Sequence, residues 1–78
     1  MTPRPFNIEQ SSLNVTLNGE PHRVAEGSTV ASLIRDLGLK SDRVAVEMNL
    51  TIVARTAWEH TEIPAAARIE VVQLVGGG

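Results

Sequence analysis

The part of this sequence best suited to a chemical reaction is its last four residues, Val75-Gly76-Gly77-Gly78. Glycine has no side chain to pack and loses the most conformational entropy when it is ordered, so three of them add nothing to a core. We therefore expect a flexible tail. A bare backbone can enter a narrow slot in a partner protein, which then reaches the carboxylate of Gly78. These residues alone leave a second interpretation open, in which the glycines are incidental residues at a frayed end.

Elsewhere the sequence offers little that could carry catalysis. His22 and His60 are far apart and lie in no metal-ligand spacing, so we interpret both as surface residues and expect no metal site. No nucleotide-binding or hydrolase motif is present. We expect Trp58 to anchor the core rather than to contact a partner. The carboxylates are scattered, which favours a solvated surface over a catalytic pair: Glu26, Asp36, Asp42, Glu47, Glu59, Glu62 and Glu70. This pattern predicts a protein that is acted upon, and not an enzyme.

Composition narrows the class of protein further. A chain of 78 residues with 42% hydrophobic residues is typical of one small globular domain. The absence of cysteine excludes disulfides and thiolate metal ligands within this sequence. A net charge of −2 argues against a nucleic-acid or anionic-membrane surface. No apolar run is long enough to span a membrane and no signal peptide is recognisable, so we expect a soluble, cytoplasmic protein that is a monomer when free.

The first part of the sequence predicts an extension followed by a hairpin. Residues 1–12 hold two of the four prolines and show little periodicity, so we interpret them as a flexible N-terminal extension. Residues 13–17 alternate between apolar and polar types, as a half-buried strand does. Asn18-Gly19 is a strong signal for a hairpin turn, because both residues tolerate positive φ. The return strand covers residues 20–25, and Pro21 marks it as irregular at its start or as lying at a sheet edge.

A helix follows the hairpin. Apolar residues recur at i, i+3, i+4 and i+7, which predicts an amphipathic helix of about three turns: Val30, Leu33, Ile34 and Leu37. The hydroxyl residues before it, Ser28 and Thr29, can serve as the N-cap. Gly38 stands where a left-handed C-cap is expected.

The second half is again strand-like. Residues 43–48 and 51–55 predict two strands joined by a turn at Asn49-Leu50, and residues 56–60 predict an irregular segment with one short 3₁₀ turn. Residues 68–74 predict the last strand. A helix with one apolar stripe buries it against one face of a sheet, so we expect a two-layer α+β domain over residues 13–75, with the glycine tail at 76–78.

Several stretches together resemble the ThiS family of β-grasp, ubiquitin-like sulfur carriers. They are residues 18–20, 26–34, 37–39, 43–49 and 68–78. The resemblance covers about residues 13–78 in order and spacing, and it implies a mixed sheet of four to five strands packed on one main helix. The MoaD family of molybdopterin carriers shares this fold and tail.

Three positions depart from the pattern of the ThiS family. Leu50 stands where members commonly have glycine, and Ala54 stands where they often have proline. Pro64 and the alanines Ala65, Ala66 and Ala67 replace an acidic, glycine-containing turn before the last strand. We expect altered loop geometry and surface charge there, with the tail unchanged.

The resemblance implies a defined chemistry for the tail. A ThiF-like adenylyltransferase, which holds ATP and Mg²⁺ itself, would transfer AMP to the Gly78 carboxylate. A persulfide supplied by a sulfurtransferase would then leave Gly78 as a thiocarboxylate, which delivers sulfur to thiazole synthase, ThiG. Val75, Gly76 and Gly77 would form the part of the tail that the partner binds. The alternatives are a MoaD-like carrier for molybdopterin or another sulfur pathway, a ubiquitin-like protein modifier, and a pure interaction module.

Overall fold

The computed structural model describes residues 12–74, which form five strands, one α-helix and two 3₁₀ helices. Residues 1–11 and 75–78 lie outside the described residues, so the predicted extension and glycine tail fall largely there. The elements in chain order are β1 (Ser12–Leu17), β2 (Glu20–Ala25), α1 (Val30–Asp36), η2 (Ser41–Arg43), β3 (Val44–Met48), β4 (Thr51–Ile52), η3 (Arg55–His60) and β5 (Arg68–Gln73).

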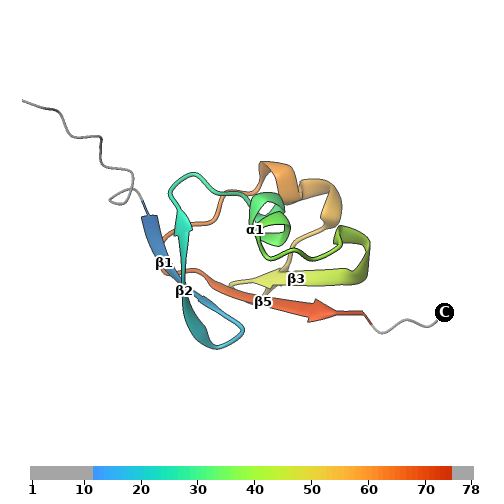
Figure 1. Cartoon of the computed structure of the whole chain (residues 1–78), viewed down its shortest axis with the longest axis horizontal. Coiled ribbons are helices and arrows are strands. Elements are labelled where there is room, and N and C mark those ends of the chain that lie inside the picture. The colour runs from blue at the N-terminus through green and yellow to red at the C-terminus, as the bar shows by residue number, and fades with distance from the viewer. Residues whose placement is uncertain (1–11, 75–78) are drawn as a thin grey trace, which may run out of the picture.

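All five strands belong to one mixed sheet in the order β2-β1-β5-β3-β4. The last strand, β5, is therefore the central one, parallel to β1 and antiparallel to β3. Helix α1 and η3 lie together over one face of the sheet, and the other face carries no helix (Figure 1). This arrangement confirms the predicted two-layer α+β fold with one main helix.

The β1–β2 hairpin forms as its turn residues predict. Asn18 and Gly19 both have positive φ, at 51° and 84°, the combination that a type I′ hairpin turn requires. The strands pair from Leu17↔Glu20 to Ser12↔Ala25. Strand β2 is an edge strand, so Pro21, which has no N–H to donate, is tolerated there.

Both ends of α1 are capped through hydrogen bonds that the sequence predicts in part. The Thr29 hydroxyl accepts a hydrogen bond from the Ser32 amide (3.1 Å), and the Ser32 hydroxyl accepts one from the Thr29 amide (3.0 Å), which makes a capping box. At the other end, Gly38 has a φ of 74°. The Gly38 N–H donates to the Arg35 carbonyl, and the Leu39 N–H donates to the Ile34 carbonyl. Helix α1 has seven residues, about two turns rather than the expected three.

The core lies between α1 and the sheet. Leu33 belongs to the same buried cluster as Val15 and Val46, and Val71 packs against this cluster from a half-buried position. Trp58 is also buried, with 4% of its surface exposed, and its Nε1–H donates to the Val53 carbonyl at 2.9 Å. Trp58 is therefore a core anchor, and its polar edge has a hydrogen-bond partner.

Several predicted boundaries differ from the structure, and among them the last strand ends at Gln73 instead of residue 74. Strand β1 begins at Ser12, which we had placed in the extension, because Ser12 pairs with Ala25. Residues 41–43 form the 3₁₀ helix η2, which the sequence did not predict. Arg43 therefore belongs to this helix and does not begin the next strand. Strand β4 ends at Ile52 instead of reaching Arg55, because Arg55 begins η3, the segment that carries Trp58 into the core.

The three departures from the ThiS-family pattern fall at positions with special backbone geometry. Leu50 and Ala66 have φ of 71° and 64°, in the left-handed region that favours glycine. Ala54 has φ of −60° and ψ of 143°, which a proline could also adopt. Leu50 and Ala66 are therefore strained where a glycine would not be, whereas Ala54 has an ordinary extended conformation.

Candidate functional site at the carboxyl end of β5

Strand β5 carries the chain to the residues predicted to react, and three hydrogen bonds from other segments secure it. The Arg68 amide donates to Oδ1 of Asn49 (2.9 Å) and the Val71 amide donates to Oδ1 of Asn18 (2.8 Å). The Leu74 amide, beyond the end of the strand, donates to the Arg43 carbonyl at 2.7 Å. The sheet therefore determines the position and direction of the chain as far as Leu74. The predicted site residues Val75, Gly76, Gly77 and Gly78 lie outside the described residues.

The outer face of the sheet, opposite α1, carries an apolar patch beside this end of β5. Side chains alternate between the two faces, so Val72 points outward while Ile69 and Val71 point toward the helix. Val72, Leu74 and Ile52 expose 56%, 51% and 75% of their surface. We call the outward residues Ala45, Ile52, Val72 and Leu74 the apolar patch. Exposed apolar groups gathered in one place are typical of a protein-binding surface.

Two carboxylates adjoin this apolar patch. Glu47 of β3 and Glu70 of β5 are directly opposite each other in the sheet register, and Ile52 of β4 is the next residue across from Glu47. Both glutamates and Ile52 line a shallow hollow of about 200 Å³ together with Val72. Like charges opposite each other on neighbouring strands are destabilising in an isolated sheet. A partner surface with basic side chains would relieve this repulsion.

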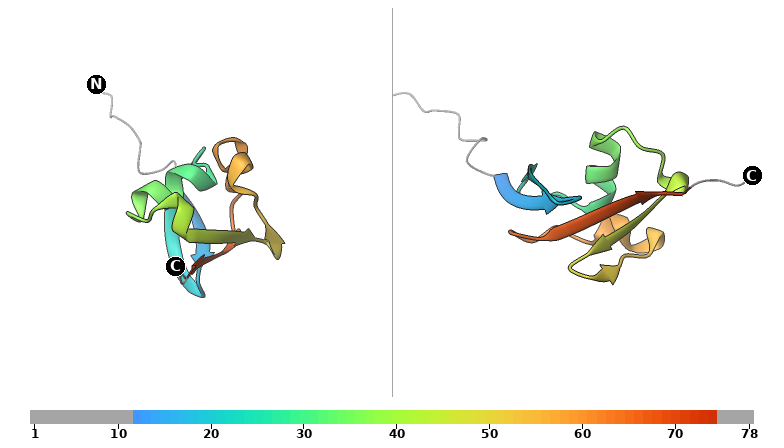
Figure 2. Two further views of the ribbon diagram at one scale, coloured as in Figure 1. Left: turned by 90° about the vertical axis from the view of Figure 1, so that its right-hand side faces the viewer. Right: turned by 90° about the horizontal axis from the view of Figure 1, so that it is seen from below.

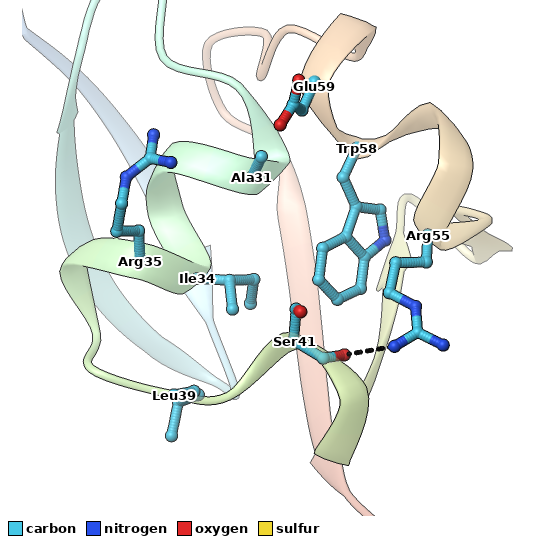
Figure 3. A pocket seen from close by; sticks show the side chains of 8 residues that line it. All are labelled: Ala31, Ile34, Arg35, Leu39, Ser41, Arg55, Trp58 and Glu59. Carbon is cyan, nitrogen blue, oxygen red and sulfur yellow. Dashed lines mark hydrogen bonds between the residues drawn. The ribbon is translucent and has the colours of Figure 1, made fainter.

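A second hollow, of about 330 Å³, lies on the helix side of the molecule (Figure 3). Trp58 and Arg55 come from η3, and Ile34 and Arg35 come from α1. The Arg55 guanidinium donates to the Ser41 carbonyl at 3.3 Å and so ties η3 to η2. This hollow is in the layer of α1 and η3, whereas the apolar patch faces away from that layer, so the two sites are distinct.

The remaining candidate residues do not form a cluster. Within residues 12–74, no group of three or more His, Cys, Asp or Glu side chains is placed to hold a metal ion. His60 is exposed and His22 is half-buried. Six of the seven carboxylates singled out in the sequence are exposed and Glu47 is half-buried. No helix within the described part of the chain is both long and apolar enough to cross a membrane.

The side-chain contacts of the two asparagines that hold β5, and the individual residues of the apolar patch, are not predicted by the sequence. Asn18 and Asn49 were interpreted only as turn residues. Their side chains bond to residues 53 and 19 positions away, so no local pattern reveals these contacts. A signal for the apolar patch was present, because Val72 occupies the outward position of an alternating strand.

Comparison with known proteins places this chain in a family. The model of the ThiS family matches residues 15–78. The crystal structure of the thiamine biosynthesis protein ThiS from Geobacter metallireducens superposes with a TM-score of 0.74 at 32% identity, covering 85% of this chain and all of that one. A solution structure of a thiamine biosynthesis protein from the same organism gives a TM-score of 0.71.

Similar sequences occur in two kinds of curated protein. A thiazole synthase of Magnetococcus marinus is 38% identical over 66 residues, which are 85% of this chain and 20% of that protein. The chain therefore spans about a fifth of the thiazole synthase it matches. An uncharacterized protein of Porphyra purpurea, ycf40, is 30% identical over 94% of its own length. From the family match, the similar structures and these relatives, the chain belongs to the ThiS family.

Proposed function

We propose that this chain carries sulfur as a thiocarboxylate at Gly78 and donates it for formation of the thiamin thiazole. The observation that carries the proposal is that the family match extends through the glycines to residue 78. The position of β5 supports it, because the central strand of the sheet leads directly into these residues. In this account the folded domain is a protein co-substrate and not an enzyme.

The proposed chemistry begins with activation of a poor electrophile. A carboxylate oxygen of Gly78 attacks the α-phosphorus of ATP, pyrophosphate leaves, and an acyl adenylate forms. The terminal sulfur of a persulfide then attacks the carbonyl carbon and AMP leaves. A thiol cleaves the resulting acyl disulfide, which releases the thiocarboxylate and leaves a disulfide on the donor side. Because this chain contains no cysteine, the persulfide and the thiol must both come from other molecules.

The partners follow from these steps. A ThiF-like adenylyltransferase would bind ATP and Mg²⁺ and form the adenylate, so this chain would need no bound cofactor. A sulfurtransferase would supply the persulfide. Thiazole synthase, ThiG, would accept the sulfur, and the thiazole synthases whose sequences match this chain over a fifth of their length support this assignment.

The tail and the domain would have separate roles. Gly76 and Gly77 have no side chains to obstruct a narrow slot, so they would give Gly78 access to the active site of the partner. Val72 and Leu74 of the apolar patch lie on the same segment of chain as the tail. A partner that docks on this patch would therefore have the tail directed toward it. Apolar side chains at the centre of an interface commonly supply most of its binding energy.

Intact-mass spectrometry after incubation with the adenylyltransferase, ATP, a persulfide donor and a thiol reductant tests the proposal. We expect a mass gain that corresponds to one oxygen replaced by sulfur, and no change when ATP is omitted. Conjugates of higher mass would indicate a ubiquitin-like modifier instead. An unchanged mass with ATP present would contradict both the sulfur-carrier and the protein-modifier functions. The interaction module would then be the alternative that remains. If sulfur is loaded but passes to a molybdopterin precursor instead of to thiazole synthase, the chain serves a MoaD-like pathway.

A further inference from the structure

Strand β5 has sheet partners on both sides only over its first half. On one side, β1 pairs with it at Thr16↔Arg68 and Leu17↔Ile69, and this pairing then stops because the chain turns into β2. On the other side, β3 pairs with it from Met48↔Ile69 to Val44↔Gln73. Figure 2 shows β1 beside only the first part of β5 (right-hand view). Among residues 12–74, the second half of this central strand therefore has an open edge.

The backbone groups at this open edge can be assigned from the hydrogen bonds on either side. The Ile69 carbonyl accepts from the Asn18 amide (2.8 Å) and the Val71 amide donates to the Asn18 side chain, so these residues point toward β1. The Leu74 amide donates to Arg43 on the β3 side. Because backbone groups alternate in direction along a strand, the Val71 carbonyl and both polar backbone groups of Gln73 face the open edge. Gln73 is exposed, so solvent reaches it.

The two outer edges of the sheet are protected against strand addition, whereas this one is not. Strand β2 carries Pro21, and β4 has only two residues, Thr51 and Ile52. Proline and very short strands are common ways in which proteins block pairing at a sheet edge. Between Val71 and Gln73, by contrast, three backbone groups stand in a row at strand spacing, immediately before the tail.

We propose that the open edge of β5 at Val71–Gln73 pairs with an extended strand of the adenylyltransferase. This inference rests on the proposed function, and it assigns the contact that would align the tail. Backbone pairing at Val71–Gln73 would fix the orientation of β5 relative to the enzyme, and β5 is the strand that leads to Gly78 in the sequence. Strand addition relies on main-chain hydrogen bonds, so it does not depend on which side chains the tail carries. It is also separate from the apolar patch, which lies on the face of the sheet.

Substitutions at Gln73 distinguish backbone pairing from side-chain recognition. Gln73→Pro removes the N–H that faces the open edge, and this N–H is not used in the ladder with β3, so the fold should remain. We expect Gln73→Pro to weaken binding to the adenylyltransferase roughly ten-fold, the effect of losing about one hydrogen bond. Gln73→Ala keeps the N–H and should bind within about two-fold of the unmodified protein. Equal binding by all three proteins would overturn the proposal, as would an equal loss in both variants.

Amide hydrogen exchange in the unmodified protein provides a test that does not depend on a variant folding. Addition of the adenylyltransferase should slow exchange at the Gln73 amide, whereas the Leu74 amide, already bonded to Arg43, should change little. If the chain is adenylated but Gln73 exchanges as fast as in the free protein, strand pairing is wrong and the proposed function stands. If this enzyme neither binds nor adenylates the chain, the proposed function and the inferred strand both fail.

Discussion

The two faces of β5 differ in what they contribute. Ile69 points toward α1 and is completely buried, whereas Val72, three residues later, points outward with 56% of its surface exposed. Burial of an apolar side chain stabilises the fold, but an exposed valine gains nothing in the free protein. A single strand can therefore stabilise the domain with one face and leave the other to bind a partner. The tail extends this separation, because its glycines have no side chain for either purpose.

The comparison predicts that changes in the tail remove activity without loss of stability. Gly77→Val places a β-branched side chain where the partner slot is proposed to accept only backbone, so we expect adenylation to fall below detection. One bulky residue added after Gly78 should have the same effect. The melting temperature should be unchanged for both variants. Adenylation is measured by the release of pyrophosphate. A normal rate for either variant would show that the slot is not narrow or that Gly78 does not react.

On the buried side the expected effect is the reverse, a loss of stability. Leu33 has 2% of its surface exposed at the centre of the core cluster, and Leu33→Ala at such a site typically costs about 2–5 kcal/mol. A domain of this size has a total stability of about 5 kcal/mol or a little more, so the variant should keep only about 0–3 kcal/mol and be marginally stable. Urea unfolding followed by circular dichroism measures the change. Leu50→Ala, at an exposed position, is the size-matched control. An unchanged unfolding midpoint for Leu33→Ala would contradict the packing of α1 on the sheet.

The outer face should show a smaller effect that is confined to binding. Val72→Ser shortens and polarises an exposed side chain, so we expect the midpoint of unfolding to shift little. Affinity for the adenylyltransferase should fall by roughly ten-fold, as for a buried apolar contact at an interface. Arg23→Ala on the edge strand β2 is the matched surface control and should bind normally. Calorimetric titration of each variant with the adenylyltransferase measures these affinities. If both variants bind the enzyme equally well, the apolar patch is not part of the interface.

The smallest effect is expected at the β3–β4 turn, which lies outside both faces of β5. Leu50 has positive φ, and Leu50→Gly should relieve that strain and stabilise the protein by about 0.5–1 kcal/mol after the larger entropy of unfolded glycine is subtracted. Leu50→Ala retains a Cβ and should give no such gain. Thermal unfolding of the two variants tests this difference. A gain of the same size in both would mean that exposure of the leucine side chain, and not its backbone, is unfavourable.

Features with a local cause were predictable from the sequence. The Asn18-Gly19 turn, the cap at Thr29 and the left-handed Gly38 each depend on a few neighbouring residues, and the structure confirms all three. The length of β4 was not predictable, because its end depends on how Trp58 reaches the core. The short pairing of β1 with β5 likewise depends on where two distant segments meet. The open edge of β5 could therefore be found only in the folded chain.

The division between a binding domain and a reacting tail can be tested with one shortened chain. The three glycines are identical, so removal of any one leaves the same protein, with its carboxylate drawn back by roughly 3.3–3.6 Å. Affinity for the adenylyltransferase and the rate of adenylation are measured on this chain and on the full-length one. We predict affinity within about three-fold, because the domain is intact, and no detectable adenylation. Adenylation at the full-length rate, or an equal loss of binding and adenylation, would contradict the account.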